Sequence, residues 1–330
     1  MEIIHGLENV SCKSGAALTV GSFDGVHLGH QRILARMRES ELRPVTVMTF
    51  EPHPQTILRQ YGEPPPQLTT SEERAEILEE LGVDRLIIAR FTPEFATLPA
   101  EIFIESILLQ QVGMARVFVG PTHGFGSGRR GDTRMLEEMG DRLGFGVEVV
   151  APVVREGKPV SSSRIRKCLL AGEAQSAFHF MARPYFMPGM VVSGDGRGKA
   201  IGFPTANIKL DAAKLIPLPG IYATLTRFGD VYHPSVSHIG ERPTFAGAEP
   251  SVETHIIGFT GEIYGSTIAV GLIDRIRDVK RFGSPTELAA QIAGDVEQAM
   301  IRLIASGFGA VAQLPNRRFG MIDKQQYLEI

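Results

Sequence analysis

Two patterns of apolar residues divide this chain, and they constrain its fold more than any other feature. Through the first 150 residues, short apolar and β-branched runs alternate with segments that carry apolar residues at helical spacing. From Phe186 onward, short strand-like runs follow one another, separated by Gly, Pro and Asp. The first pattern predicts βαβ units and a parallel sheet covered on both faces. The second predicts an antiparallel β-barrel or sandwich.

The elements can be placed from these patterns. In the first part, the predicted strands are 16–20, 44–50, 85–89, 116–119 and 147–150. The predicted helices there are 28–37, 71–81, 100–111 and 132–143, with N-caps at Ser71 and Asp132. In the second part, the predicted strands are 189–193, 220–227, 231–239, 251–259 and 268–276, followed by a helix over 284–305. We therefore predict an α/β domain over residues 1–182 and a β-barrel domain over residues 183–330.

Composition and charge limit the kind of protein this can be. A chain of 330 residues suggests about two domains, and its net charge of -3 provides no basic field for nucleic acid or an anionic membrane. The two cysteines, Cys12 and Cys168, lack metal-ligand spacing. We see no secretory signal and no apolar run of membrane-spanning length. We expect a cytoplasmic protein that acts on small molecules, with no nucleic-acid or membrane partner and at most weak homo-oligomerisation.

The segment from Thr19 to His30 is a candidate phosphate site. It leads from a strand through Gly21 and Gly25 into a helix, an arrangement that presents backbone N–H groups and a helix dipole to an anion. His27 and His30 fall on one face where that helix begins, and imidazoles there can donate to phosphate oxygens. The alternative is a pair of surface or capping histidines. The glycine-bearing turn directly after a strand favours the phosphate site.

Two further segments point to anions or to the same crevice. Ligands of open parallel sheets bind at the carboxyl ends of strands, so we expect the loops 21–30, 49–54 and 120–131 to face one crevice. Residues 158–166 lead into a helix whose first turns carry Arg164 and Arg166 after a run of serines. Basic residues there oppose the helix dipole, which suggests that an anion binds. An ordinary serine-capped helix with solvated arginines is the alternative.

Several motifs together resemble one family. In the first half they are Gly-Ser-Phe-Asp-Gly-Val-His-Leu-Gly-His (21–30), Thr-Phe-Glu-Pro-His-Pro (49–54) and Ser-Ser-Ser-Arg-Ile-Arg (161–166). In the second half they are Gly-Asp-Gly-Arg-Gly-Lys-Ala-Ile-Gly-Phe-Pro-Thr-Ala-Asn (194–207), Ile-Gly-Glu-Arg-Pro-Thr-Phe (239–245) and Val-Glu-Thr-His (252–255). Over nearly the whole chain, the sequence resembles the prokaryotic bifunctional riboflavin kinase/FAD synthetase. The resemblance implies that the barrel phosphorylates riboflavin with ATP to FMN. The first domain would then transfer AMP from ATP to FMN, giving FAD and pyrophosphate.

For adenylyl transfer, the resemblance assigns His27 and His30 to the ATP phosphates. Ser162, Arg164 and Arg166 would bind the β- and γ-phosphates that leave as pyrophosphate. Because the FMN phosphate is already an anion, no general base is needed. The other predicted ATP- and flavin-binding residues are Gly21, Phe23, Asp24, Gly29, His53, Thr122, Gly126, Ser161 and Ser163. Asp24 could equally be a turn-forming residue, and His53 a rigid loop residue.

For the kinase, the resemblance assigns Glu253 as the base that takes the proton of the riboflavin hydroxyl. Without the resemblance, a strand carboxylate would be interpreted as a solvated residue. Thr205 and Asn207 supply neutral oxygens suited to Mg²⁺, the alternative being a β-turn after Pro204. The other predicted ligands, mostly glycines that let the backbone approach phosphates, are Gly194, Gly196, Gly198, Lys199, Gly202, Pro204 and Arg242.

Three places depart from the family pattern. The loop 119–126 carries Thr122 and His123 where Asp or Asn and an aromatic residue are usual, and Pro121 stiffens it. Ser163 replaces Thr, and His238 replaces Asn. Losing one polar contact costs about 1–3 kcal/mol, which weakens FAD synthesis without abolishing it. The alternative hypothesis is an active riboflavin kinase whose impaired first domain serves as a nucleotide- or flavin-binding regulatory module.

Overall fold

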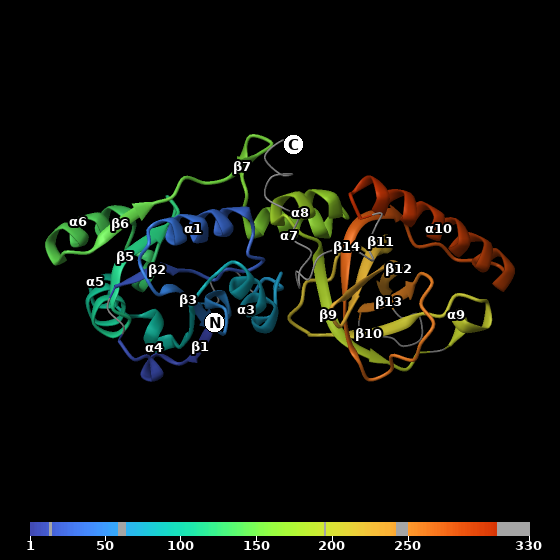
Figure 1. Ribbon diagram of the computed structural model, residues 1–330, viewed down its shortest axis with the longest axis horizontal. Coiled ribbons are helices and arrows are strands. Elements are labelled where there is room, and N and C mark those ends of the chain that lie inside the picture. The colour runs from blue at the N-terminus through green and yellow to red at the C-terminus, as the bar shows by residue number, and fades with distance from the viewer. Residues whose placement is uncertain (13–14, 59–63, 195, 242–249, 309–330) are drawn as a thin grey trace. The chain divides into compact units, whose positions relative to one another are not determined.

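The chain forms two compact units, residues 1–161 and 162–330 (Figure 1). The computed structural model describes residues 1–330 except 13–14, 59–63, 195, 242–249 and 309–330. Arg242, predicted as a kinase-site residue, therefore lies outside the described residues. The units divide at 161/162, before the predicted domain boundary at 182/183, because two helices (residues 162–170 and 174–181) group with the barrel.

The first unit is built on a six-stranded parallel sheet. Its strand order is β1-β4-β3-β2-β5-β6, with every neighbouring pair parallel. The strands are β1 (Glu2–His5), β2 (Ala16–Val20), β3 (Val45–Glu51), β4 (Arg85–Arg90), β5 (Met114–Val119) and β6 (Gly146–Val149). After β4 the chain crosses back over the sheet to place β5 beside β2. The order of strands therefore reverses between β2 and β5, and ligands bind outside the carboxyl ends of strands at such a point.

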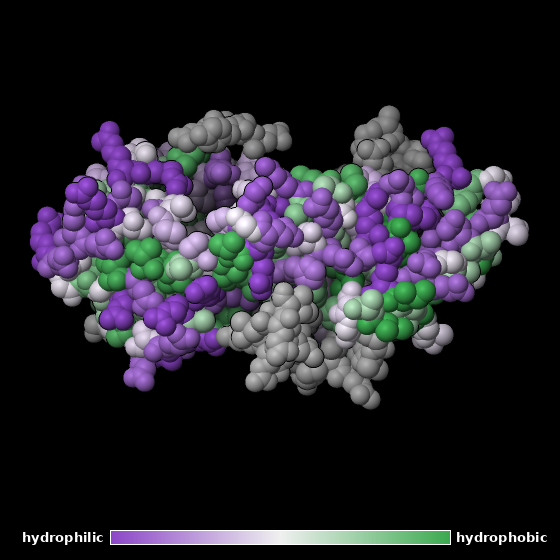
Figure 2. All heavy atoms as spheres, turned by 90° about the horizontal axis from the view of Figure 1, so that it is seen from above, coloured by the Kyte–Doolittle hydropathy of each residue, from purple (hydrophilic) through white to green (hydrophobic). Residues whose placement is uncertain are grey.

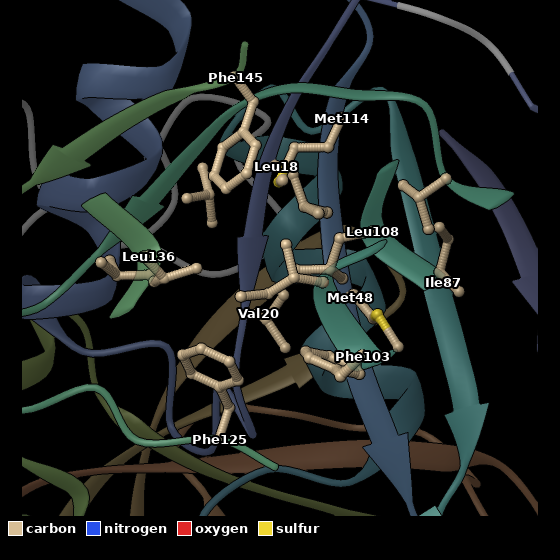
Figure 3. Close-up of a cluster of buried hydrophobic side chains, with 14 of the residues drawn as sticks. Leu18, Val20, Met48, Ile87, Phe103, Leu108, Met114, Phe125, Leu136 and Phe145 are labelled. Atoms are coloured by element: carbon tan, nitrogen blue, oxygen red, sulfur yellow. The ribbon is translucent and has the colours of Figure 1, made fainter. Parts of the chain in front are cut away.

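Helices cover the sheet. They are α1 (Leu28–Glu39), α2 (Pro54–Leu58), α3 (Ser71–Glu80), α4 (Pro93–Ala96), α5 (Ala100–Ile102), the π-type helix η2 (Phe103–Gln111) and α6 (Thr133–Leu143), with short turns η1 (Leu7–Asn9) and η3 (Ser127–Arg129). A hydrophobic cluster joins sheet residues such as Leu18 to η2 and α6 (Figure 3). In Figure 3, Phe103 and Phe125 lie at one end of this cluster and Met114 and Phe145 at the other. A small hairpin of β7 (Val154–Arg155) and β8 (Lys158–Pro159) ends the unit.

The second unit contains a closed antiparallel barrel of six strands. Their order is β10-β13-β12-β11-β14-β9. The strands are β9 (Tyr185–Val192), β10 (Ala206–Leu210), β11 (Gly220–Phe228), β12 (Val231–Glu241), β13 (Pro250–Ile256) and β14 (Thr267–Arg277). The helices of this unit are α7 (Ser162–Leu170), α8 (Ala174–Met181), α9 (Arg197–Ala200) and α10 (Pro285–Ala305). Helix α10 packs on the outside of β11 and β12, around Ile221, Ala223, Val236 and Ala299.

The barrel interior holds a hydrogen-bonded set of hydroxyl groups. Thr224 and Thr226 of β11, Ser235 and Ser237 of β12 and Thr254 of β13 are fully buried. Their side-chain oxygens lie 2.8–3.4 Å from one another. Because residues alternate between the two faces of a strand, Glu253 and His238, which are adjacent in sequence to Thr254 and Ser237, point to the outer face of the barrel.

The predicted fold class is confirmed, and the second part is a barrel rather than a sandwich. The predicted helices and strands are present, with ends shifted by a few residues. Ser71 was predicted as a helix N-cap, and this is wrong by one residue: Thr70 accepts from Glu73 N–H, and Glu73 completes a capping box. Strands β1 and β10 and helix α8 have no counterpart among the predicted elements.

Hydrophilic and hydrophobic residues are intermingled on the face drawn in Figure 2. Within the part of the chain that the structure describes, no helix is both long enough and apolar enough to cross a membrane.

Candidate active sites

The first site lies at the carboxyl ends of three adjacent strands, β3, β2 and β5. Their following loops, 49–54, 21–30 and 120–131, are therefore neighbours, as predicted. One hydrogen bond ties the first two loops together, from Thr49 Oγ1 to the Ser22 carbonyl oxygen at 3.2 Å. Arg74 Nη1 of α3 donates to the same oxygen at 2.8 Å. The reversal of strand order between β2 and β5 places two of the three loops where ligands bind in such sheets.

His27 and His30 lie together at the start of α1. Their rings are stacked, with centroids 3.8 Å apart and planes at 17°, and Phe23 packs on His30 at 4.7 Å. His27 is the N-cap of α1, and its Nδ1 accepts the Gly29 N–H at 3.1 Å. Since Nδ1 acts as an acceptor, the neutral imidazole carries its proton on Nε2. His27 therefore caps the helix, as in the alternative interpretation, and its Nε2–H can also donate to an oxyanion.

Asp24 anchors the turn that precedes α1. Its carboxylate is 2% exposed and accepts the N–H groups of Leu68 and Thr69 at 2.9 and 3.0 Å. Gly25 N–H in turn donates to Thr69 Oγ1 at 3.0 Å, and Gly25 has a φ of 77° that glycine adopts without strain. These contacts show a structural role for Asp24; its role in ligand binding stays a prediction. His53 Nδ1 accepts the Gln55 N–H at 3.3 Å, at the start of α2.

The loop after β5 carries the departures from the family pattern. Thr122 is exposed, and its carbonyl oxygen accepts a hydrogen bond from the Arg129 guanidinium at 3.4 Å. The His123 ring stacks on Phe125 with centroids 5.6 Å apart. Burial, reinforced by the charge of Arg129, lowers the pKa of His123 to about 4. His123 is therefore neutral at physiological pH and offers one donor and one acceptor. Gly126 is needed because a Cβ there would meet the Ala100 backbone.

A row of aromatic rings continues from this loop along the same edge of the sheet. Phe125, Phe103, Phe95, Phe50 and Phe91 follow one another with centroids 5.5–6.0 Å apart. Phe103 and Phe125 belong to the core, whereas the other three are half-buried. The row forms an apolar wall beside the phosphate-site loops. The sequence analysis missed it because these rings come from β3, α4, η2 and two loops.

The Ser161–Arg166 motif spans the division of the chain into units, with Ser161 in the first unit and residues 162–166 in the second. Ser162, Ser163, Arg164 and Arg166 lie in the first turns of α7, which confirms the predicted helix. The Arg164 guanidinium carbon lies 4.2 Å from the ring centroid of Phe180 on α8, a cation–π contact. This contact fixes the stem of Arg164, and the phosphate-binding roles of the motif stay predictions.

The predicted kinase residues form a row across three barrel strands. Asn207 of β10 is paired with Glu253 of β13, which is paired with His238 of β12. Paired residues have side chains on the same face, so these three lie side by side. Among the described residues, no hydrogen bond or ion pair engages the Glu253 carboxylate. Burial lowers the pKa of His238, although the Glu253 charge raises it. A neutral His238 adds no positive charge beside that carboxylate.

The glycine-rich segment connects β9 to β10 directly before this row. Asn207 is also paired with Val192 of β9, so residues 193–206 connect these two paired positions. A Cβ at Gly194 would overlap the Asn207 amide, and one at Gly198 would overlap the Phe203 carbonyl oxygen. Gly196 and Gly202 have φ values of 69° and 87°. The loop thus depends on glycine for close approach at two positions and for left-handed backbone at two others. Lys199 and Pro204 in the same loop are exposed.

The sequence was compared with models of known families. One described as FAD synthetase matches residues 9–164, and one described as Riboflavin kinase matches residues 181–303. The chain belongs to the bifunctional riboflavin kinase/FMN adenylyltransferase family. It is accordingly an enzyme of flavin biosynthesis with both transferase activities, phosphorylation of riboflavin and adenylyl transfer to FMN. The hypothesis that the first domain is only a regulatory module is not favoured.

Curated relatives match along almost their full length. The bifunctional riboflavin kinase/FMN adenylyltransferase of Escherichia coli is 36% identical over 301 residues, 89% of this chain and 96% of that protein. That of Bacillus subtilis is 33% identical over 303 residues, 90% of this chain and 94% of that protein. Among solved structures, one named as a macrolide-efflux protein from Streptococcus pneumoniae superposes with a TM-score of 0.82. It is 30% identical and covers 91% of this chain and 99% of that one.

Proposed function

We propose that ATP binds for adenylyl transfer at the turn between β2 and α1. The observation that carries this is the N-cap geometry of His27, which orients Nε2–H as the donor while the stacked His30 lies beside it. Together with the backbone of the glycine turn, these donors would neutralise charge on the ATP phosphates during transfer. The FMN phosphate attacks as an anion, so no side chain has to remove a proton.

The remaining assignments for adenylyl transfer follow from the family motif. Ser161, Ser162, Ser163, Arg164 and Arg166 would bind the departing pyrophosphate. The aromatic row supports a place for the flat flavin ring, because its half-buried members, such as Phe95, offer apolar faces of matching shape. Gly21, Phe23, Gly29 and Gly126 would shape the walls of this site.

For the kinase, we propose that Glu253 accepts the proton of the riboflavin hydroxyl as that oxygen attacks the γ-phosphate of ATP. The cross-strand pairing of Glu253 with Asn207 carries this assignment, because it puts the base beside the end of the glycine-rich loop. The loop backbone at Gly194, Gly196, Gly198 and Gly202 would hold the phosphates, with Lys199 near them. The proton ends on the carboxylate, and ADP leaves.

The residues also fit a magnesium ion bound with ATP. Thr205 and Asn207 offer neutral oxygens, the ligand type that Mg²⁺ takes together with phosphates and water. Asn207 is the second residue of β10 and Thr205 directly precedes that strand, so continuing the alternation of the strand by one residue puts Thr205 on the face of Asn207. Mg²⁺ would neutralise charge on the transferred phosphate. Thr205 and Asn207 would hold it opposite the strand that carries Glu253.

One experiment tests both assignments in the full-length chain. The protein is incubated with ATP and Mg²⁺ and either riboflavin or FMN, and FMN, FAD and pyrophosphate are measured. Glu253→Gln should stop FMN formation from riboflavin while FAD still forms from added FMN. His30→Ala should give the reverse. If one variant stops both reactions, the two sites are not separate as proposed.

We also propose that residues 1–182 form the adenylyltransferase module and residues 183–330 the kinase module. The start of the riboflavin kinase match at residue 181 supports this boundary. The compact unit that contains the barrel begins earlier, because it includes α7 and α8. The net charge of -3 supports a cytoplasmic enzyme that acts on small molecules without nucleic-acid or membrane partners. We expect at most weak self-association, which analytical ultracentrifugation at several concentrations would measure.

A further inference from the structure

A second side chain on the Glu253 strand contacts the glycine-rich loop. His255 follows Glu253 by two residues, so both side chains lie on the same face of β13. Its Nδ1 lies 2.8 Å from the carbonyl oxygen of Pro204. A carbonyl oxygen only accepts, so Nδ1 must carry the proton in this contact. The hydrogen bond therefore runs from β13 to the last loop residue before Thr205.

The same imidazole also packs on the residue before Pro204. The ring of Phe203 meets the His255 ring edge to face, with centroids 5.4 Å apart and planes at 77°. Phe203 N–H in turn donates to the Gly198 carbonyl oxygen at 2.9 Å. One histidine thus joins the middle of the glycine-rich loop, through Phe203 and Pro204, to the strand that carries the proposed base.

The ladder between β10 and β13 does not reach the loop at Pro204. Proline has no N–H, so Pro204 cannot donate to a neighbouring strand. The ladder between β10 and β13 begins only at the pair Ala206 and Thr254. Extending that register by one residue puts Thr205 opposite His255, just as Asn207 is opposite Glu253. A glycine-rich loop also loses much conformational entropy when it is ordered, so a single tether at its end matters.

We propose that His255 is a positioning residue of the kinase: its Nδ1–H holds the Pro204 carbonyl and thereby keeps Thr205 and Asn207 aligned with Glu253. This inference rests on the proposed kinase site. His255 itself touches neither the reacting hydroxyl nor the transferred phosphate. Its loss should act mainly through weaker binding of MgATP, with a smaller effect on the chemical step.

Three substitutions at His255 distinguish the effect of its hydrogen bond from the effect of its ring. In His255→Asn the amide nitrogen takes the place of Nδ1 and keeps the donor, whereas His255→Gln moves the amide toward the place of Nε2. His255→Phe keeps a ring against Phe203 and removes the donor. His233 is the matched control, because its ring meets Phe259 in the same manner, at 5.5 Å and 75°, and no hydrogen bond of its side chain occurs among the described residues.

Riboflavin phosphorylation is measured in the full-length chain over a range of MgATP concentrations, with FAD formation from FMN as an internal measure of folding. We expect His255→Phe and His255→Gln to raise KM for MgATP about tenfold, because the free energy of one hydrogen bond corresponds to about a tenfold change in affinity. His255→Asn should stay within about threefold of the unmodified protein, and His233→Phe should equal it.

Specific results would overturn the inference. If KM for MgATP is unchanged in His255→Phe, the hydrogen bond to Pro204 does not position the loop. If His255→Asn is as impaired as His255→Phe, the ring matters and the donor does not. An equal loss in His233→Phe shows a general effect on the barrel. Glu253→Gln is assayed alongside: if it retains full kinase activity, the proposed kinase site is wrong, whatever the His255 variants do.

Discussion

The two units hold their phosphate-handling groups in different ways. In the α/β unit the groups project from turns at the ends of strands, and single side chains fix those turns. His27 caps α1, and the Asp24 carboxylate binds the backbone of Leu68 and Thr69. In the barrel the proposed base and its neighbour sit within paired strands, where Asn207 and Glu253 are cross-strand partners, and the glycine-rich loop proposed for the phosphates precedes Asn207.

This difference matches the chemistry that each unit performs. Adenylyl transfer to a phosphate requires donors that stabilise charge, and a helix start with a glycine turn supplies them. Phosphorylation of a hydroxyl also requires a base at a fixed place relative to the phosphate loop. A strand position is suited to this, because a slip of one residue in register would turn the carboxylate to the other face.

The largest expected effect comes from removing the proposed base of the kinase, a group that adenylyl transfer does not need. Glu253→Gln should lower the riboflavin kinase rate about a thousandfold, within the usual range for a general base, because the amide cannot accept the proton. FAD formation from FMN should stay within about twofold. Rates of both reactions are measured on one preparation, with the exposed Glu262→Gln as control. Kinase activity above a tenth of normal would mean that the unit works without this base.

A smaller loss is expected at the helix start of the first unit. His30→Ala should lower FAD formation about a hundredfold, the effect of losing a group that stabilises transition-state charge, and leave the kinase rate unchanged. His5→Ala, at the exposed last residue of β1, is the control. Initial rates of pyrophosphate release are compared at saturating FMN. Full activity of the His30 variant would place the ATP phosphates elsewhere.

Much of the fold follows from local sequence patterns, and the exceptions are informative. The helix with His27 and His30 is predictable because spacing of three residues puts both on one face. Strand β1 was missed because four residues at the chain start carry no turn signals on both sides. Strand β10 was missed because it directly follows a glycine- and proline-rich run that predicts a loop.

The sites are less predictable, because they depend on contacts between distant segments. Asp24 had two open interpretations, and only the position of Leu68 and Thr69 shows where its carboxylate binds. The row of Asn207, Glu253 and His238 depends on the register of three strands, which no local pattern fixes. Motif similarity predicts roles for Glu253 and Asn207, and the register of the sheet places the two side by side.

The pH dependence of the free energy of unfolding tests whether His123 is neutral in the folded chain. The pKa of His123 is lowered from 6.5 to about 4, so between these values the unfolded chain binds a proton that the folded chain does not. The free energy of unfolding should therefore fall as the pH drops from 6.5 toward 4. His123→Phe should remove at most about 2 kcal/mol of that loss at pH 5 and change little at pH 7. Urea unfolding at both pH values measures this; equal pH dependence in both proteins would contradict it.

The smallest effect concerns the loop that departs from the family. Thr122 is exposed, and Arg129 already engages its carbonyl oxygen. Thr122→Asn replaces the short hydroxyl with a longer amide that carries a separate donor and acceptor, without adding charge near the phosphates. One added hydrogen bond should improve kcat/KM for FMN in FAD formation about three- to tenfold. The kinase rate, set by the barrel, should not change. If Thr122→Asn leaves FAD formation as it was, then His123, which as a neutral imidazole offers one donor and one acceptor, already supplies the polar contact that Thr122 lacks. The double variant Thr122→Asn with His123→Phe would then lose no activity, because the restored amide replaces the imidazole.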